Sequence, residues 1–397
     1  MNSFSTRKKL IVTILLTVVF AALALMGGCS DLLIVSDKHY MEADGSLINE
    51  NASSEAVKLM AFLKSQYGRR IISGQYVNEY EDFSAPEFRV DPSDPQSPTT
   101  VFKANEMQAV HKVTGDYPVV AGFDVSVVLL DQANYSVEQA IEWHNAGGIV
   151  TFCWHWLVDN FDGKERAFYT ERTAFDLKKA LSDKNSAQYK GIIADIDKVS
   201  EYMKRLRDNN VPVLWRPLHE ASGGWFWWGA GGEDAYKELW DIVYERMAVY
   251  HGLNNLIWVT NPQHPDWYVG DDKCDMVGDD PYYDFNERKA YEKDRSNKSR
   301  FKKSYAFAKN KMIAMTENDF IPNIDTAFDK NVKWLFFATW CREFVCEYVP
   351  DENGNYYTKP RYSAMCNSEE ELIEIYSDDR VLTLSKIKES GLYDTVR

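Results

Sequence analysis

The sequence predicts a single (β/α)8 barrel with long loops on the face at the carboxyl ends of its strands. Eight short apolar runs lead to this fold class, at residues 70–75, 117–124, 148–155, 211–216, 256–259, 276–278, 312–316 and 334–340. Near-continuous hydrophobicity of this kind is typical of parallel strands that are covered on both faces. Segments with helical periodicity lie between several of the runs, at residues 137–145, 193–209, 234–250 and 369–390. This alternation of runs and helices indicates repeated βα units.

Three connections that follow predicted strands are unusually long, at residues 80–100, 156–189 and 341–365. Long structureless loops in compact domains are usually functional or disordered, and the loops after the strands of a barrel lie on its catalytic face. We therefore expect these three segments to be irregular and to form the walls of a cleft.

The fourth apolar run ends in a dense group of polar and aromatic residues. Residues 211–229 contain Arg216, His219 and Glu220, then two glycines and several tryptophans. Burial and neighbouring charges at the end of a strand can shift a carboxyl pKa into the range useful for proton transfer. Alternatively, Glu220 is a carboxylate in the first turn of a helix and the tryptophans fill the core.

The sequence Leu-His-Glu at residues 218–220, followed by Ala-Ser-Gly-Gly-Trp-Phe-Trp-Trp, closely resembles the acid/base motif of glycoside hydrolase family 26, the family of bacterial β-mannanases. Related barrel glycosidases usually carry Asn before this glutamate, so His219 favours family 26 in particular. The resemblance extends from about residue 70 to residue 340. It implies a retaining hydrolase of β-1,4-mannosidic linkages in mannan, glucomannan or galactomannan. Some members instead cleave mixed-linkage β-glucan or β-1,3-xylan, and a lipoprotein that binds glycan without cutting it is a further alternative.

Retaining hydrolysis needs a second carboxylate as nucleophile, about 5 to 5.5 Å from the acid/base. The best candidate is Glu317, which ends a short apolar run 97 residues after Glu220. Three βα repeats of about 30 residues cover that span, which fits strands four and seven of the barrel. The family more often has Glu-x-Gly at the nucleophile, whereas Asn318 and Asp319 follow Glu317 here. Asp279 or Asp280 is the alternative nucleophile.

Further polar and aromatic residues fall at strand ends and are expected to surround the glutamates. By the resemblance, His155 binds the sugar just before the cleaved bond and Tyr282 donates a hydrogen bond to the nucleophile. Because positive charge and donated hydrogen bonds favour a carboxylate, Arg216 is expected near Glu317. The remaining expected binding residues are Asp280 and His219 as supporting partners, and Trp225 and Trp340 as platforms for sugar rings. His155 could instead be a hydrogen-bonded packing residue.

No cofactor or metal is expected, since the sequence contains no HExxH, EF-hand or CxxC pattern. The net charge of −15 argues against nucleic acid and suits a neutral polysaccharide partner. We expect a monomer. Five cysteines remain beside Cys29, so at least one is unpaired, and a bridge between Cys346 and Cys366 stays open.

The amino terminus has the pattern of a secretory signal: three basic residues at 7–9, an apolar run at 10–26, and then Gly27, Gly28 and Cys29. This pattern resembles a bacterial lipoprotein signal in which Cys29 carries the lipid, although Met26 replaces the more usual leucine. The alternatives are an ordinary signal peptide and a retained anchor. We expect residues 1–28 to be the signal, 29–52 a polar tether and 53–397 the catalytic domain, lipid-anchored in the envelope of a Gram-negative bacterium, at its outer membrane.

Overall fold

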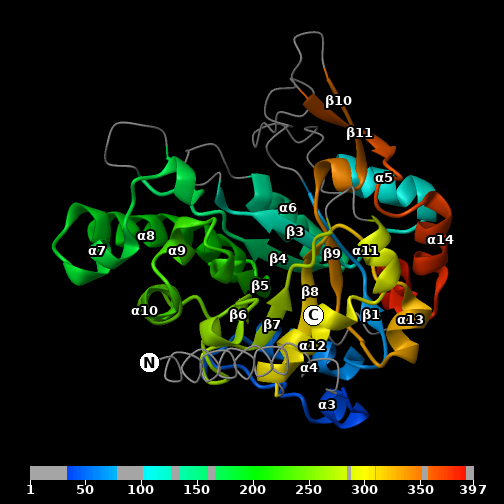
Figure 1. The fold of residues 1–397 in the computed structure, drawn as a ribbon, viewed down its shortest axis with the longest axis horizontal. Coiled ribbons are helices and arrows are strands. Elements are labelled where there is room, and N and C mark those ends of the chain that lie inside the picture. The colour runs from blue at the N-terminus through cyan, green and yellow to red at the C-terminus, as the bar shows by residue number, and fades with distance from the viewer. Residues whose placement is uncertain are drawn as a thin grey trace, which may run out of the picture.

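Eight parallel strands close into a barrel in the computed structural model, which describes residues 34–77, 102, 104–126, 135–159, 166–283, 288–308, 310–350 and 356–389 (Figure 1). The strands pair in sequence order: β2 (Gly74–Tyr76), β3 (Val120–Asp124), β4 (Ile149–Cys153), β5 (Val213–Arg216), β6 (Leu256–Thr260), β7 (Met276–Asp279), β8 (Met312–Asn318) and β9 (Phe337–Thr339). Each strand overlaps one of the eight predicted apolar runs. The predicted fold class is therefore confirmed.

Burial explains why the strands have almost no polar residues before their carboxyl ends. Every residue of the eight strands is buried, as expected for parallel strands with a packed barrel interior on one face and helices on the other. The register aligns the strand ends, so that Asp124 of β3 pairs with Cys153 of β4, and Asp279 of β7 pairs with Met315 of β8. Polar residues just after these positions consequently meet at one mouth of the barrel.

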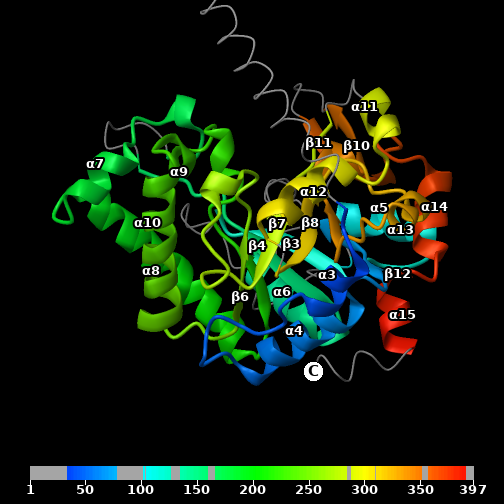
Figure 2. The same cartoon turned by 60° about the horizontal axis from the view of Figure 1, so that its bottom comes forward.

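Helices surround the strands, as Figures 1 and 2 show. They include α4 (Ser54–Gln66), α5 (Asn105–Thr114), α6 (Tyr135–Ala146), α8 (Ala187–Asp208), α10 (Glu233–Tyr244), α12 (Lys298–Phe307) and α13 (Ile324–Asp329). In α8 the side chains of Ile192, Ile196, Val199 and Met203 are buried at intervals of three to four residues. This helix begins earlier than the predicted residue 193 because Ser186 caps it by accepting a hydrogen bond from the backbone N–H of Tyr189.

Two predicted elements divide in the structure. The helix predicted at residues 369–390 is wrong as one element: α14 (Glu369–Ser377) and α15 (Leu384–Glu389) are separated by β12 (Val381–Leu382). This strand pairs in parallel with β1 (Ile71–Ile72), which the sequence had assigned to the first barrel strand. Both strands are buried, and this burial favours the pairing of residues 381–382 with β1 over their continuation as a helix. The helix predicted at 234–250 consists of α10 followed by a π-helical segment, Glu245–Tyr250.

The described part of the predicted tether, residues 34–52, packs against the barrel instead of extending from it. It contains α3 (Asp37–Glu42), and the side chains of Val35, Tyr40 and Ala43 are buried. The Tyr40 hydroxyl donates to the carbonyl of Asn331, whose side-chain amide donates to the carbonyl of Val35, both at 2.9 Å. Because most residues of this segment are polar, the sequence did not indicate that its few apolar side chains cover the base of the barrel. The rest of the predicted tether and the predicted signal lie outside the described residues.

Two of the three expected loops contain regular structure. Residues 341–365 include the antiparallel hairpin of β10 (Cys346–Pro350) and β11 (Tyr356–Tyr362), which packs on α5 through a 2.9 Å hydrogen bond from Asn105 Nδ2 to Thr358 Oγ1. Residues 156–189 include α7 (Leu177–Ser182) and the start of α8. The expectation of structureless loops is therefore wrong for these segments. Residues 80–100 all lie outside the described part of the chain.

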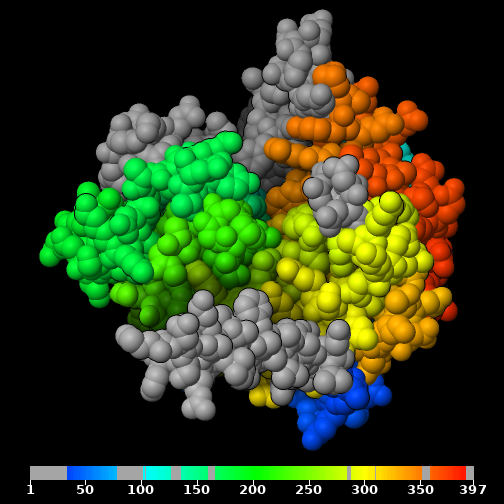
Figure 3. Space-filling view, in the orientation of Figure 1, coloured from blue at the N-terminus to red at the C-terminus, as the bar shows by residue number. Residues whose placement is uncertain are grey.

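Figure 3 shows the hairpin in orange at the upper edge of the molecule, above the yellow segments that follow β7.

The five cysteines from Cys153 onward are buried and unbridged, including Cys346 and Cys366. In the described ranges, no helix combines the length and the apolar character needed to cross a bilayer.

Candidate active site

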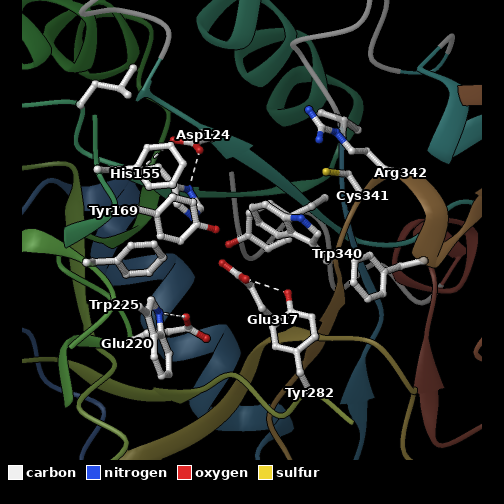
Figure 4. Close-up of a pocket in the computed structure, with 16 residues that line it drawn as sticks. Asp124, His155, Tyr169, Glu220, Trp225, Tyr282, Glu317, Trp340, Cys341 and Arg342 are labelled. Carbon is white, nitrogen blue, oxygen red and sulfur yellow. Dashed lines mark hydrogen bonds and ion pairs between the residues drawn. The ribbon is translucent and has the colours of Figure 1, made fainter. Parts of the chain in front are cut away.

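A cavity of about 550 Å³ lies at the carboxyl ends of the strands (Figure 4). Seven of the eight barrel strands contribute a lining residue from their carboxyl ends or from the segment just after them: Tyr76, Asp124, His155, Glu220, Tyr282, Glu317 and Trp340. The size is that of a small-molecule site, and the position is where barrels carry their chemistry.

The two predicted glutamates enter this cavity from strands four and seven of the barrel. Glu220 follows β5, and Glu317 lies in β8. Both carboxyl groups project into the same space and toward one another in Figure 4. The alternative nucleophile Asp279 is fully buried in contact with Arg300 and Ser304, and it does not line the cavity.

The backbone is irregular at both glutamates, and these irregularities orient their side chains. The register of β8 against β9 shifts between Met315 and Asn318, so the regular pairing of the two strands is interrupted at Glu317. Glu220 has φ of 54°, in the left-handed region that non-glycine residues seldom adopt, and its backbone N–H donates to Asn261 Oδ1 at 3.1 Å. Backbone strain held in place by a side chain is a frequent property of functional sites.

Both oxygens of Glu317 accept hydrogen bonds from residues that the sequence had selected. Tyr282 donates its hydroxyl to Oε2 at 2.8 Å, and Arg216 donates to Oε1. Arg216 is fully buried and also contacts Asp280, with 2.7 Å between Nη1 and Oδ2. A buried carboxylate with a guanidinium and a phenol on its two oxygens is both oriented and charge-compensated.

Tyr76, which sequence reasoning missed, and Asp280 complete the surroundings of Arg216. Arg216 Nη2 donates to the Tyr76 hydroxyl at 3.2 Å. The Tyr76 ring fits because β3 carries glycine opposite it: a Cβ on Gly122 would lie 2.5 Å from the ring. Burial raises the pKa of the Asp280 carboxyl to about 7, with the Arg216 charge opposing the rise, and Thr316 donates to Asp280 Oδ1 at 2.6 Å.

Glu220 has a different environment, which favours its protonated form. Burial, followed by the charges of Asp280 and Glu317, raises the pKa of Glu220 to about 8, with Arg216 and the hydrogen bond from Trp225 acting in the opposite direction. Trp225 Nε1 donates to Oε2 at 3.0 Å, and Gln263 Nε2 donates to Oε1 at 3.4 Å. At neutral pH, Glu220 therefore retains a proton that it can donate to a bound molecule.

A histidine pair lies beside the glutamates. His155 Nδ1 contacts Asp124 Oδ2 at 2.7 Å, and His155 Nε2 lies 3.2 Å from His219 Nε2. Although burial acts to lower it, the Asp124 charge raises the pKa of His155, while burial and the Arg216 charge hold the pKa of His219 well below its usual range. The raised pKa of His155 and the lowered pKa of His219 favour His155 as the donor and His219 as the acceptor in this contact. Asp124 was missed as a site residue, although it ends the second predicted strand.

Aromatic side chains form much of the cavity wall. Trp225 is 44% exposed, and Trp340 lies between Tyr76 and His155, with ring centroids 4.7 and 5.7 Å away. Phe168, Tyr169 and Phe226 also line the cavity and were not selected from the sequence. Such rings offer flat apolar surfaces for the C–H faces of sugars.

Asp319 supports Tyr282 from outside the cavity. Its carboxylate accepts the backbone N–H groups of Tyr283 and Phe320, both at 2.6 Å, and burial raises its pKa to about 7. The contact fixes the backbone next to Tyr282. The sequence indicated this residue only through its position: Asp319 stands two residues after Glu317, where the family more often has glycine.

Within the described residues, the metal-compatible group is Asp124, Cys153 and His155. It fits a metal poorly, because Asp124 and His155 already bind each other and burial raises the pKa of the Cys153 thiol well above its usual range. A metal-binding cysteine acts as a thiolate, which this environment disfavours.

Comparisons with known proteins agree with this architecture. The sequence model of the family described as "Glycosyl hydrolase family 26" matches residues 48–357. A mannan endo-1,4-beta-mannosidase of Thermothelomyces thermophilus is 35% identical over 86% of this chain and 63% of its own length. Mannan endo-1,4-beta-mannosidase A of a Piromyces species is also 35% identical, over 76% of this chain and 46% of its own. The chain thus spans about half to two thirds of these curated relatives.

Among solved structures, the GH26-CBM35 β-(1,4)-mannanase of Podospora anserina superposes with a TM-score of 0.68 at 34% identity. The match covers 87% of this chain and 70% of that one. The residues matched by the family model, 48–357, include all eight strands of the barrel.

Proposed function

Since the chain belongs to glycosyl hydrolase family 26, we propose that it is a retaining glycoside hydrolase that cleaves β-1,4-mannosidic linkages in mannan, glucomannan or galactomannan. One observation supports this most strongly. Two carboxyl groups project into one cavity, from the end of β5 and from β8; burial raises the pKa of Glu220 to about 8, whereas Glu317 accepts hydrogen bonds from Arg216 and Tyr282. Unequal environments of two carboxyls suit an acid and a nucleophile.

The proposed reaction has two displacements. Glu317 attacks the anomeric carbon, and the bond to the glycosidic oxygen breaks while Glu220 gives its proton to that oxygen. The sugar is now an ester of Glu317. Glu220 then removes a proton from water, the water oxygen bonds to the anomeric carbon, and the ester bond breaks to restore Glu317. Two inversions at one carbon give net retention.

The surroundings of the glutamates support a neutral sugar chain as the substrate. Indole and phenyl surfaces line the cavity, and His155, whose two ring nitrogens contact Asp124 and His219, would contact the sugar just before the cleaved bond with its ring. The named relatives are mannanases, and the net charge of −15 is compatible with an uncharged polysaccharide. Stacking and hydrogen bonding together recognise such substrates without a charged patch.

The substrate assignment is tested by incubating the purified protein with mannan, xylan and lichenan and measuring released reducing ends. We expect release from mannan to be fastest, since the motif at residues 218–228 resembles the mannanases. Fastest release from lichenan or β-1,3-xylan would move the assignment to another activity of the family. Binding of mannan without release from any polysaccharide would identify a glycan-binding protein instead.

The pH dependence follows from Glu220. Because only its protonated form can donate to the leaving oxygen, kcat/KM on mannohexaose should fall about tenfold per pH unit above about pH 8. With a dinitrophenyl β-mannobioside, whose leaving group needs no proton, kcat/KM should not decrease above this pH. If the decrease persists with this activated substrate, it is caused by a group other than Glu220.

The amino-terminal pattern leads to the proposal that Cys29 is lipidated and holds the enzyme at the outer membrane, on its periplasmic or outer surface. Cells fed labelled palmitate should incorporate label into the protein, and a Cys29→Ala variant should lose the label and leave the membrane fraction. A labelled Cys29→Ala protein would contradict lipidation at this residue.

A further inference from the structure

Residues 34–53 cross the base of the barrel, at the end opposite the cavity. Loops that precede four consecutive barrel strands hold this segment through hydrogen bonds to its backbone, from Asn254 before β6, Asp275 before β7, Asn310 before β8 and Asn331 before β9. Because the strands are parallel, these loops lie at the amino ends of the strands, away from the cavity. Figure 1 shows α3 at the bottom of the molecule and the β10–β11 hairpin at the top.

The lipid proposed at Cys29 is attached only five residues before Ile34. An extended chain spans at most about 3.6 Å per residue, so these residues can separate Ile34 from the lipid headgroups by no more than about 18 Å. Helix α8 leads back from the mouth end of the barrel to the start of β5, and its 22 residues make it about 33 Å long. A cavity that faced the membrane would therefore place Ile34 farther from the lipid than its connection allows.

We propose that the base of the barrel lies against a phospholipid surface, so that the cavity faces away from the membrane and is open to a polysaccharide. This inference rests on the proposed lipidation of Cys29. The surface that contacts the lipid is here called the basal surface, and it is defined by Ile34, Met41, Lys64, Arg69 and Lys333.

The basal surface includes the two most exposed large apolar side chains of the described residues. Ile34 is 83% exposed and Met41 is 72% exposed. Isolated exposed apolar side chains are common on protein surfaces, but these two lie within eight residues of each other and next to the proposed site of lipidation. Apolar side chains at such a place can enter the boundary between headgroups and acyl chains, which adds to the attachment given by the lipid.

Basic side chains lie beside Met41. A hollow of about 410 Å³ at the base is lined by Met41 together with Lys64, Arg69 and Lys333, and the acidic residue among its lining is Asp37. Lys64 Nζ donates to the carbonyl of Met41 at 2.9 Å, which holds this charge next to the apolar side chain. A local excess of positive charge, in a chain with a net charge of −15, is suited to the phosphates of lipid headgroups.

Quenching by spin-labelled lipid headgroups tests which end of the barrel lies at the membrane. The full lipidated protein is reconstituted into vesicles of phosphatidylethanolamine and phosphatidylglycerol that also contain phosphatidylcholine with a spin label on its headgroup. A maleimide dye is attached through Lys38→Cys on α3 or Arg361→Cys on the hairpin, since both side chains are exposed and the five cysteines from Cys153 onward are buried.

We expect the dye at position 38 to be quenched at least about threefold more than the dye at position 361, because this quenching requires near contact and the barrel is about 30 Å long. The double variant Ile34→Ser with Met41→Ser should lower the quenching at position 38 about twofold, since it removes the apolar side chains from the contact. Met365→Ser is the matched control: Met365 is also exposed but follows the hairpin, so quenching should not change.

Equal quenching at the two positions in membrane-bound protein, or stronger quenching at position 361, would overturn the proposed orientation. Unchanged quenching in the double variant would overturn the contact of Ile34 and Met41 with lipid. A protein that does not associate with the vesicles would refute the lipidation of Cys29, and the orientation with it. Hydrolysis of mannan by the same sample reports on the proposed function separately, because none of these variants lies in the cavity.

Discussion

Replacing Glu317 with alanine should lower kcat on mannan by at least about 10⁴-fold, because the other cavity carboxylates among the described residues are Glu220, the acid/base, and Asp124, which contacts His155. The two residues that bind Glu317, Arg216 and Tyr282, cannot attack the anomeric carbon in its place. Initial rates of reducing-end release, compared at equal protein concentration, measure the effect. Glu317→Gln should be equally inactive, since the amide keeps the shape but is not a nucleophile.

Glu245→Ala is the control for the loss of a glutamate, because Glu245 is exposed on the π-helical segment away from the cavity. It should retain the parental rate. If Glu317→Ala also hydrolyses mannan at the parental rate, the assignment of the nucleophile is wrong.

Replacing Glu220 with alanine should lower kcat/KM on mannan by about 10²- to 10⁴-fold, the usual contribution of a general acid. The loss should depend on the leaving group. Dinitrophenolate leaves without a proton, so the first displacement should survive with a dinitrophenyl mannobioside. The second displacement still lacks a base, so the glycosyl-enzyme should accumulate and produce a burst of dinitrophenolate in stopped-flow absorbance.

Azide provides the complementary measurement for Glu220→Ala. It is a nucleophile that needs no base, so it should displace Glu317 from the glycosyl-enzyme, accelerate turnover of the dinitrophenyl mannobioside and yield a β-mannobiosyl azide. Equal losses for good and poor leaving groups, with no rescue by azide, would show that Glu220 does not act as acid/base.

The barrel and its two glutamates were predictable because their signals are local. Each strand is a short apolar run whose burial is the same along its whole length, and Glu220 and Glu317 stand directly at or after such runs. Burial and register then bring them to one mouth without further information. Arg216 was expected near Glu317 because of its charge, and Tyr282 because of the family resemblance; in the structure both donate to Glu317, and Asp280 contacts Arg216.

The features that escaped prediction depend on partners distant in the sequence. The pairing of β12 with β1 joins residues more than 300 positions apart, and nothing within residues 369–390 signals it. Residues 34–52 appear polar because the few apolar side chains among them, such as Tyr40, are buried only by a later part of the chain. The contact of Asp124 with His155 likewise requires two adjacent strands in register.

The most direct test of the paired glutamates is to trap the covalent intermediate. A mannobiosyl fluoride with fluorine at the 2-position of its reacting sugar slows both displacements, and its activated leaving group lets the first proceed faster than the second. Mass spectrometry of the digested protein should find the added sugar on the peptide that contains Glu317, and Glu317→Gln should remove it. An adduct on another carboxylate, or products released with inverted configuration, would contradict the account.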